Sequence, residues 1–278
     1  MISLKFAVRS CVVVLALFAL PSLIWANPVV FSASGPNAAA VQATVDAFRA
    51  QLGGGSVAGA NGSFGGVRRE INWDGVPDNL SAPNNMPANF FNSNSPRGAV
   101  FSTPGTGFQV SGNAGVAPVR FDNINPTYSS VFQTFSPQRL FTAVGSNILD
   151  VNFFVAGTNT PASVSGFGSI FTDVDLNLTT IEFFNTSGDS LGVFTAPTAN
   201  NGLSFLGVFF NAGERIGRVR ITNGNVALGP NDVPPNADVV VMDDFIYSEP
   251  AAVPEPATLI LLITGMSAAA ASCKRRKN

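Results

Sequence analysis

The sequence has no histidine and only two cysteines among its 278 residues. Both cysteines, Cys11 and Cys273, lie in apolar runs near the two ends, so the long region between them contains no thiol. That region can form no disulfide within itself. The same absences exclude Ser-His-Asp and Cys-His catalysis there, together with metal sites built on histidine or cysteine.

Lysine is almost as scarce, and the three lysines (Lys5, Lys274 and Lys277) also lie near the ends. Between Asn27 and Pro256 the chain has nine arginines and seventeen acidic residues, a formal net charge of −8. An acidic protein surface repels phosphate backbones, so we expect no nucleic-acid partner. Roughly 230 residues are enough to bury a core in one domain without cross-links.

The first 26 residues have the order of a secretory signal peptide. Lys5 and Arg9 precede the apolar run Cys11–Leu20, and Ala26 is a small residue at the expected cleavage point before Asn27. Positive charge, an apolar run and a small-residue cleavage site, in this order, are typical of exported proteins. We predict that residues 1–26 are a signal peptide removed after Ala26.

The end of the chain has a second targeting pattern. An uncharged apolar segment, Ala257–Cys273, follows a short acidic motif and precedes a basic cluster. The motif is Pro254, Glu255 and Pro256, and the cluster is Lys274, Arg275, Arg276 and Lys277. As a helix the apolar segment spans roughly 25 Å, the lower limit for crossing a bilayer, with the basic cluster on the cytoplasmic side. We predict a transmembrane helix over about 257–273, whose marginal length favours a processed signal over a permanent anchor.

This three-part tail resembles the PEP-CTERM sorting signal. In that family, found in Gram-negative bacteria that make exopolysaccharide, a membrane-embedded exosortase recognises the Pro-Glu-Pro motif and processes the protein near it. The resemblance covers residues 250–278, about a tenth of the chain. It implies export across the inner membrane, insertion through the C-terminal segment before processing, an exosortase-like partner, and delivery to the cell surface or extracellular matrix. A plain membrane anchor with an accidental Pro-Glu-Pro is the alternative.

One segment between the two signals has a helical pattern. The apolar residues at helical spacing are Val41, Val45, Phe48 and Leu52. They predict an amphipathic helix over Asn37–Leu52 that packs its apolar face on the domain behind it, with a partner-binding helix as the alternative. The glycine-rich residues 53–66 are predicted to be a linker, so that residues 27–66 precede the main domain.

From residue 67 to 249, short apolar segments alternate with Gly, Pro, Asn and Ser, which is typical of strands separated by turns. The predicted strands are Arg68–Trp73, Ala99–Thr103, Phe108–Ser111, Val131–Phe135, Arg139–Val144, Leu149–Val155, Gly168–Thr172, Thr179–Phe184, Leu191–Thr195, Phe205–Phe210, Gly217–Thr222 and Val239–Ile246. Residues 185–189 are predicted to form a hairpin turn. About a dozen strands and one helix predict an all-β fold, an antiparallel sandwich of jelly-roll type.

Four aspartates are candidates for a structural Ca²⁺ site. Asp173 and Asp175 follow one predicted strand, and Asp243 and Asp244 lie in the last one. Calcium prefers such hard oxygen ligands. No other cofactor is predicted.

Residues 166–175 and 242–247 also resemble carbohydrate-binding jelly rolls and galactose-binding-like domains, in which a closing Asp-Asp-aromatic strand is common. This loose resemblance supports the fold and implies carbohydrate binding as one function. In the alternative to calcium binding, the first aspartate pair caps a turn and the second pairs with Arg218 or Arg220.

Trp73 is a candidate ligand-binding residue, because an exposed tryptophan can stack under a sugar ring. It is the one tryptophan between the two signals and lies among arginine, acidic and asparagine side chains. In the alternative, which we favour, Trp73 is buried and Arg69–Glu70 or Arg68–Asp74 form ordinary surface pairs.

The composition gives little support to an enzyme. A glycosidase needs two carboxylates roughly 5 to 9 Å apart, a criterion that many acids meet by chance. Sandwich-type polysaccharide lyases use Tyr, His, Lys or Arg, and the region between the signals has no His or Lys and only Tyr128 and Tyr247. We predict no catalytic residues. The leading hypothesis is a non-enzymatic surface protein of an exopolysaccharide-rich envelope or biofilm matrix; a carbohydrate-binding module and a carbohydrate-active enzyme are the alternatives.

Overall fold

The computed structural model describes residues 28–113 and 118–253. The predicted signal peptide, sorting motif, transmembrane helix and basic cluster lie outside these residues. Within the described part, no helix is long and apolar enough to cross a membrane.

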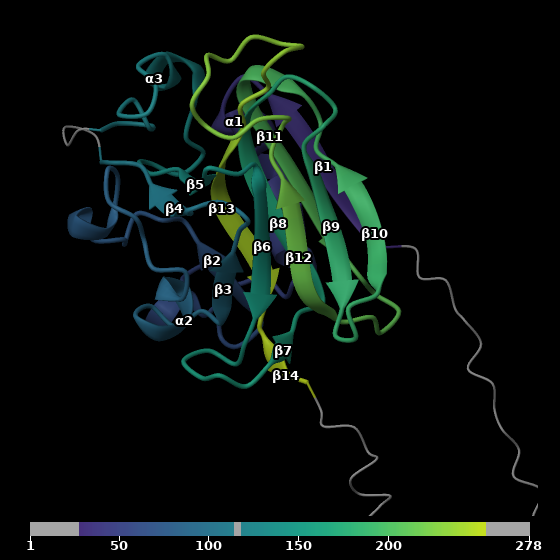
Figure 1. Ribbon diagram of the computed structural model, residues 1–278. Coiled ribbons are helices and arrows are strands. Elements are labelled where there is room, and N and C mark those ends of the chain that lie inside the picture. The colour runs from purple at the N-terminus through teal and green to yellow at the C-terminus, as the bar shows by residue number, and fades with distance from the viewer. Residues whose placement is uncertain (1–27, 114–117, 254–278) are drawn as a thin grey trace, which may run out of the picture.

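The described chain forms an antiparallel β-sandwich, as predicted (Figure 1). The larger sheet has the strand order β1-β11-β8-β13-β5-β4, and β2 also pairs with β13. Its strands are β1 (Val29–Gly35), β2 (Arg68–Ile71), β4 (Gly107–Val110), β5 (Phe141–Val144), β8 (Gly166–Val174), β11 (Ala199–Phe209) and β13 (Val241–Ser248). The smaller sheet has the order β10-β9-β12-β6-β3. Its strands are β3 (Ala99–Ser102), β6 (Ile148–Phe153), β9 (Thr180–Asn185), β10 (Ser190–Thr195) and β12 (Ile216–Thr222).

The remaining elements are short, apart from one helix. Strands β7 (Ala162–Ser163) and β14 (Ala251–Ala252) pair with each other near the end of the described chain. The helices are α1 (Ala38–Gln51), α2 (Phe90–Ser93) and α3 (Tyr128–Val131), and the 3-10 turns are η1 (Ala60–Gly62) and η2 (Asp78–Leu80). The predicted hairpin turn joins β9 to β10.

The larger sheet is covered on both faces, by the smaller sheet on one side and by α1 on the other (Figure 1). On β8, Phe171 therefore belongs to the core between the sheets, whereas its neighbour Ile170 packs under the helix. Strands β8 and β13 are consequently buried at every residue. The acidic residues that these two strands carry are buried with them.

The predicted amphipathic helix is confirmed, and it packs on the sheet. The Asn37 side chain caps it by accepting a hydrogen bond from the Ala40 amide at 3.3 Å. Its buried residues are Val41, Val45 and Phe48. Gly168 and Gly207 face each other on β8 and β11, and a Cβ atom at either would lie 2.9 or 3.0 Å from the Phe48 ring. These two glycines make the hollow that receives Phe48.

Two local structures differ from the sequence prediction. Val29–Gly35, where no strand was predicted, is an edge strand that pairs with β11. The predicted strand Val131–Phe135 is wrong, because helix α3 ends inside it and the amides that follow bond to side chains. The Gln133 amide donates to the Thr172 hydroxyl and the Phe135 amide to the Asp243 carboxylate. Each of the other predicted strands overlaps an observed one.

Candidate functional site

Trp73 lies inside the core and offers no ring face to a ligand. It is 1% exposed and stacks on Phe141 with the ring centres 3.9 Å apart. Its indole N–H donates to the backbone carbonyl of Asp243 at 2.9 Å. The structure therefore confirms the alternative in which Trp73 is buried. The ion pairs expected beside it differ as well, since Arg68 pairs with Glu70 and Arg69 pairs with Glu249.

Beside this segment, α1, β2 and β13 enclose a polar pocket of about 460 Å³. Its charged groups already have partners within the protein. Arg49 binds Glu70 at 2.8 Å and lies 3.7 Å from Asp244, and Arg97 donates to the Glu70 backbone carbonyl at 2.7 Å. The network holds the helix against the sheet.

Asp243 and Asp244 lie at a bulge, where the pairing of β13 with β8 shifts register between Met242 and Phe245. Asp243 accepts a hydrogen bond from the Phe135 amide at 2.6 Å, and Asp244 accepts one from the Ser136 hydroxyl at 2.7 Å. Through these hydrogen bonds, the two carboxylates at the bulge hold the segment before β5.

The expected pairing of Asp243 or Asp244 with the arginines of β12 is wrong. Arg218 and Arg220 instead bind Asp150, on the neighbouring strand β6, at 2.9 and 2.8 Å. The arginines of β12 therefore belong to the exposed face of the smaller sheet, on the far side of the core from the bulge.

The aspartate pair of the bulge makes stability depend on pH. Burial raises the pKa of Asp244 to about 6, and burial together with the Asp244 charge raises the pKa of Asp243 well above 3.8. Because the folded state holds these protons more tightly than the unfolded chain, their stabilising contribution is complete below about pH 4 and declines above it, and the contribution of Asp244 is lost as the pH rises through about 6. We expect Asp243→Asn to reduce the fall in Tm between about pH 5 and about pH 7.5 by roughly 3 °C.

Thermal unfolding of the wild type and the variant at both pH values measures this effect. The exposed Asp189, in the turn between β9 and β10, provides the control substitution Asp189→Asn. An equal fall in Tm for all three proteins would contradict the prediction.

A second group of acids lies where β8 ends. One carboxylate oxygen from each of Asp173, Asp175 and Asp232 lies within 4.8 Å of the others. Of the four aspartates predicted to bind calcium, the structure thus brings together Asp173 and Asp175, and Asp232 joins them in place of the β13 pair. Burial, with Asp232 beside them, raises the pKa of Asp173 to about 8 and that of Asp175 to about 6.

Sequence reasoning missed Asp232. It lies in the loop of residues 223–240 between β12 and β13, where Pro, Gly and Asn indicate only turns. The partner of Asp173 is likewise distant, because its Oδ1 accepts a hydrogen bond from the Asn201 amide of β11 at 2.6 Å. Asp173 therefore does not cap a turn of its own segment.

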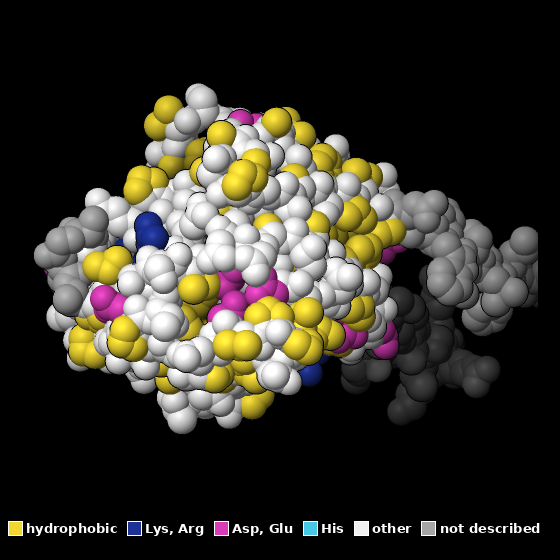
Figure 2. Space-filling model, turned by 90° about the horizontal axis from the view of Figure 1, so that it is seen from above, with side chains coloured by type: hydrophobic (Ala, Val, Ile, Leu, Met, Phe, Trp, Pro, Cys, Tyr) yellow, Lys and Arg dark blue, Asp and Glu magenta, His cyan; other side chains and the backbone are white. Residues whose placement is uncertain are grey.

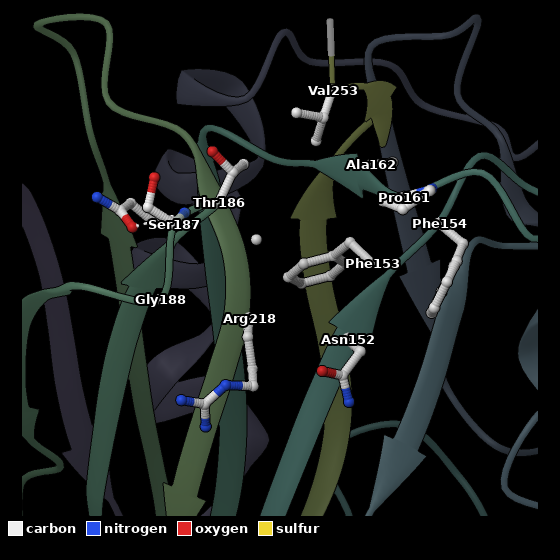
Figure 3. Close-up of a pocket in the computed structure, with 12 residues that line it drawn as sticks. Asn152, Phe153, Phe154, Pro161, Ala162, Thr186, Ser187, Gly188, Arg218 and Val253 are labelled. Atoms are coloured by element: carbon white, nitrogen blue, oxygen red, sulfur yellow. Dashed lines mark hydrogen bonds between the residues drawn. The ribbon is translucent and has the colours of Figure 1, made fainter. Parts of the chain in front are cut away.

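A second pocket, of about 390 Å³, lies between β6, β12 and the β9–β10 turn (Figure 3). Phe153 and Ala162 provide apolar walls, and Val253, the last described residue before the motif, lines its edge. Arg218 borders this pocket but is paired with Asp150, so the pocket offers no free charge from this residue. No protein-family model, no curated protein and no solved structure matches the chain.

Proposed function

We propose that this chain is a non-enzymatic surface or extracellular-matrix protein, exported through its N-terminal signal and sorted through Pro254, Glu255 and Pro256 by an exosortase-like enzyme. The observation that carries the proposal is the tail, whose acidic motif, apolar segment and basic cluster occur in the order of the PEP-CTERM signal. The sandwich is the cargo, and an exopolysaccharide-rich envelope is its destination.

The positions of the chain ends support this role. Val29 pairs with Phe209, which also pairs with Gly166 at the start of β8. Ala251 pairs with Ser163, three residues before Gly166. The described chain therefore begins and ends at the same end of the sandwich, and β8 rises roughly 26 Å to the acidic cluster at the other. Attached through its C-terminal segment, the sandwich presents this cluster away from the membrane.

Replacing Pro254, Glu255 and Pro256 together with alanine tests the sorting role. In the native host we expect the variant to be retained in the membrane fraction as a form larger than the wild type by about the mass of the tail. Immunoblots of membrane, surface and medium fractions measure size and location. Glu249→Gln, which changes the nearest acid before the motif, is expected to be processed normally. Unchanged size and location of the triple variant would refute the sorting role.

A carbohydrate-binding module is the second candidate, favoured by the polar pocket beside α1. Arg49, Glu70, Asn72, Arg97 and Asp244 line this pocket with the guanidinium, carboxylate and amide groups that bind sugar hydroxyls. A glycan array combined with a reducing-sugar assay separates the candidates. Binding without release identifies a module, release identifies an enzyme, and neither is expected of a purely structural protein.

A further inference from the structure

Two of the three clustered aspartates, Asp173 and Asp175, have buried oxygens that no hydrogen bond reaches. Asp173 is 1% exposed, and although its Oδ1 is bonded to Asn201, its Oδ2 has no donor. Both carboxylate oxygens of Asp175 are also buried without a hydrogen bond, although the nearby Asn200 side chain lowers the pKa of this carboxyl. Burying a carboxylate oxygen without a partner costs free energy, so these atoms indicate a positively charged ligand.

No basic side chain offsets the charge of the cluster. Among residues 28–113 and 118–253, no ion pair includes Asp173, Asp175 or Asp232. Figure 2, which shows this end of the molecule, has acidic side chains gathered near its centre and the visible basic side chains apart from them. Carboxylates held this closely in a partly buried place repel one another. A divalent cation between them attracts each carboxylate and offsets this repulsion.

We propose that Asp173, Asp175 and Asp232 bind a calcium ion. Calcium takes about six to eight oxygen ligands in a flexible geometry, which suits carboxylates from two separate segments supplemented by backbone and water oxygens. Magnesium requires a nearly ideal octahedron and fits such a cluster less well. Zinc favours the nitrogen and sulfur ligands that the region between the signals lacks. The site goes beyond the proposed sorting and surface role and does not depend on it.

Asp238 is a positioning residue for this site. Its two carboxylate oxygens accept hydrogen bonds from the amides of Asp175 at 3.2 Å and Leu176 at 3.1 Å. The Val239 amide in turn donates to Asp232 at 2.9 Å, which fixes the direction of that side chain. The ion therefore joins the end of β8 to the loop of residues 223–240, which these hydrogen bonds already hold in place.

Thermal unfolding of the purified full chain, with calcium and with a chelator, tests the site. We expect calcium to raise Tm by roughly 5 to 10 °C when its free concentration is about a hundred times Kd, because the ion binds only the folded state. Calorimetric titration with calcium chloride should show one site per chain, and magnesium at equal concentration should give a smaller shift. The absence of both a calcium-dependent Tm shift and binding heat at millimolar calcium would refute the site. A Tm shift that magnesium produces and calcium does not would refute it as well.

Variants separate loss of a ligand from loss of the fold. Asp175→Asn and Asp232→Asn should each abolish the calcium shift. In chelator each should melt at or above the wild-type temperature, because each removes a carboxyl group from a partly buried cluster in which ionised carboxylates repel one another. Asp189→Asn, at an exposed turn outside the cluster, should keep the full shift. A shift retained in both cluster variants, or lost equally in Asp189→Asn, would overturn the proposal.

Discussion

Replacing Trp73 with alanine is expected to lower the free energy of unfolding by about 4 kcal/mol, among the largest effects for any single side chain of this protein. Beyond the stack on Phe141, the Trp73 ring meets Phe91 and Phe245 edge to face, with centre distances of 5.3 and 5.1 Å. Truncation leaves a cavity among these rings. It also removes the hydrogen bond to the buried Asp243 carbonyl at the bulge.

Urea unfolding followed by circular dichroism measures the loss. Trp73→Phe keeps most of the apolar ring but removes the indole N–H, so it should cost less than alanine, roughly 2 kcal/mol. Val193→Ala, at a side chain that is 58% exposed, should change stability by less than about 0.5 kcal/mol. A cost below about 1 kcal/mol for Trp73→Ala would mean that the ring is outside the core, and would restore it as a ligand platform.

The fold was largely predictable, because alternating apolar residues report which side chains share a face of a strand. The predicted strand Gly217–Thr222 and the helical spacing that ends at Leu52 both correspond to observed elements. The predicted strand at Val131–Phe135 was wrong because apolar content does not say what a backbone amide bonds to. There the acceptors are the side chains of Thr172 and Asp243, which lie far along the chain.

The candidate site was predictable only in part, for the same physical reason. Asp173 and Asp175 are close in sequence, so local structure alone places them near each other. Asp232 reaches them because the loop between β12 and β13 folds over the end of β8, and spacing in the sequence contains no such information. The bulge in β13 diverts Asp243 and Asp244 toward residues 135–136, and local composition gave no sign of a bulge.

The contact between α1 and the larger sheet should be energetically coupled through Phe48 and Gly207. Phe48→Ala is expected to cost about 3 to 5 kcal/mol, since the ring is fully buried among Phe31, Phe205 and the paired glycines. Gly207→Ala should cost about 1 to 3 kcal/mol, because its new Cβ atom would lie 3.0 Å from the Phe48 ring and 2.9 Å from Phe205.

In the double variant the added methyl group occupies part of the space that Phe48 leaves, so the two costs should fall short of their sum by about 1 kcal/mol or more. Urea unfolding of the wild type, the two single variants and the double variant completes the cycle. Gly75→Ala, at a position with open space around its Cβ, is the matched control and should add to Phe48→Ala without coupling. Strict additivity of Phe48→Ala and Gly207→Ala would mean that the helix does not occupy the glycine hollow. Coupling of the expected size would mean that α1, together with β1, is an integral part of the sandwich. A version that begins at residue 67 lacks both elements, so it would expose the outer face of β8 and β11 and lose the cooperative fold.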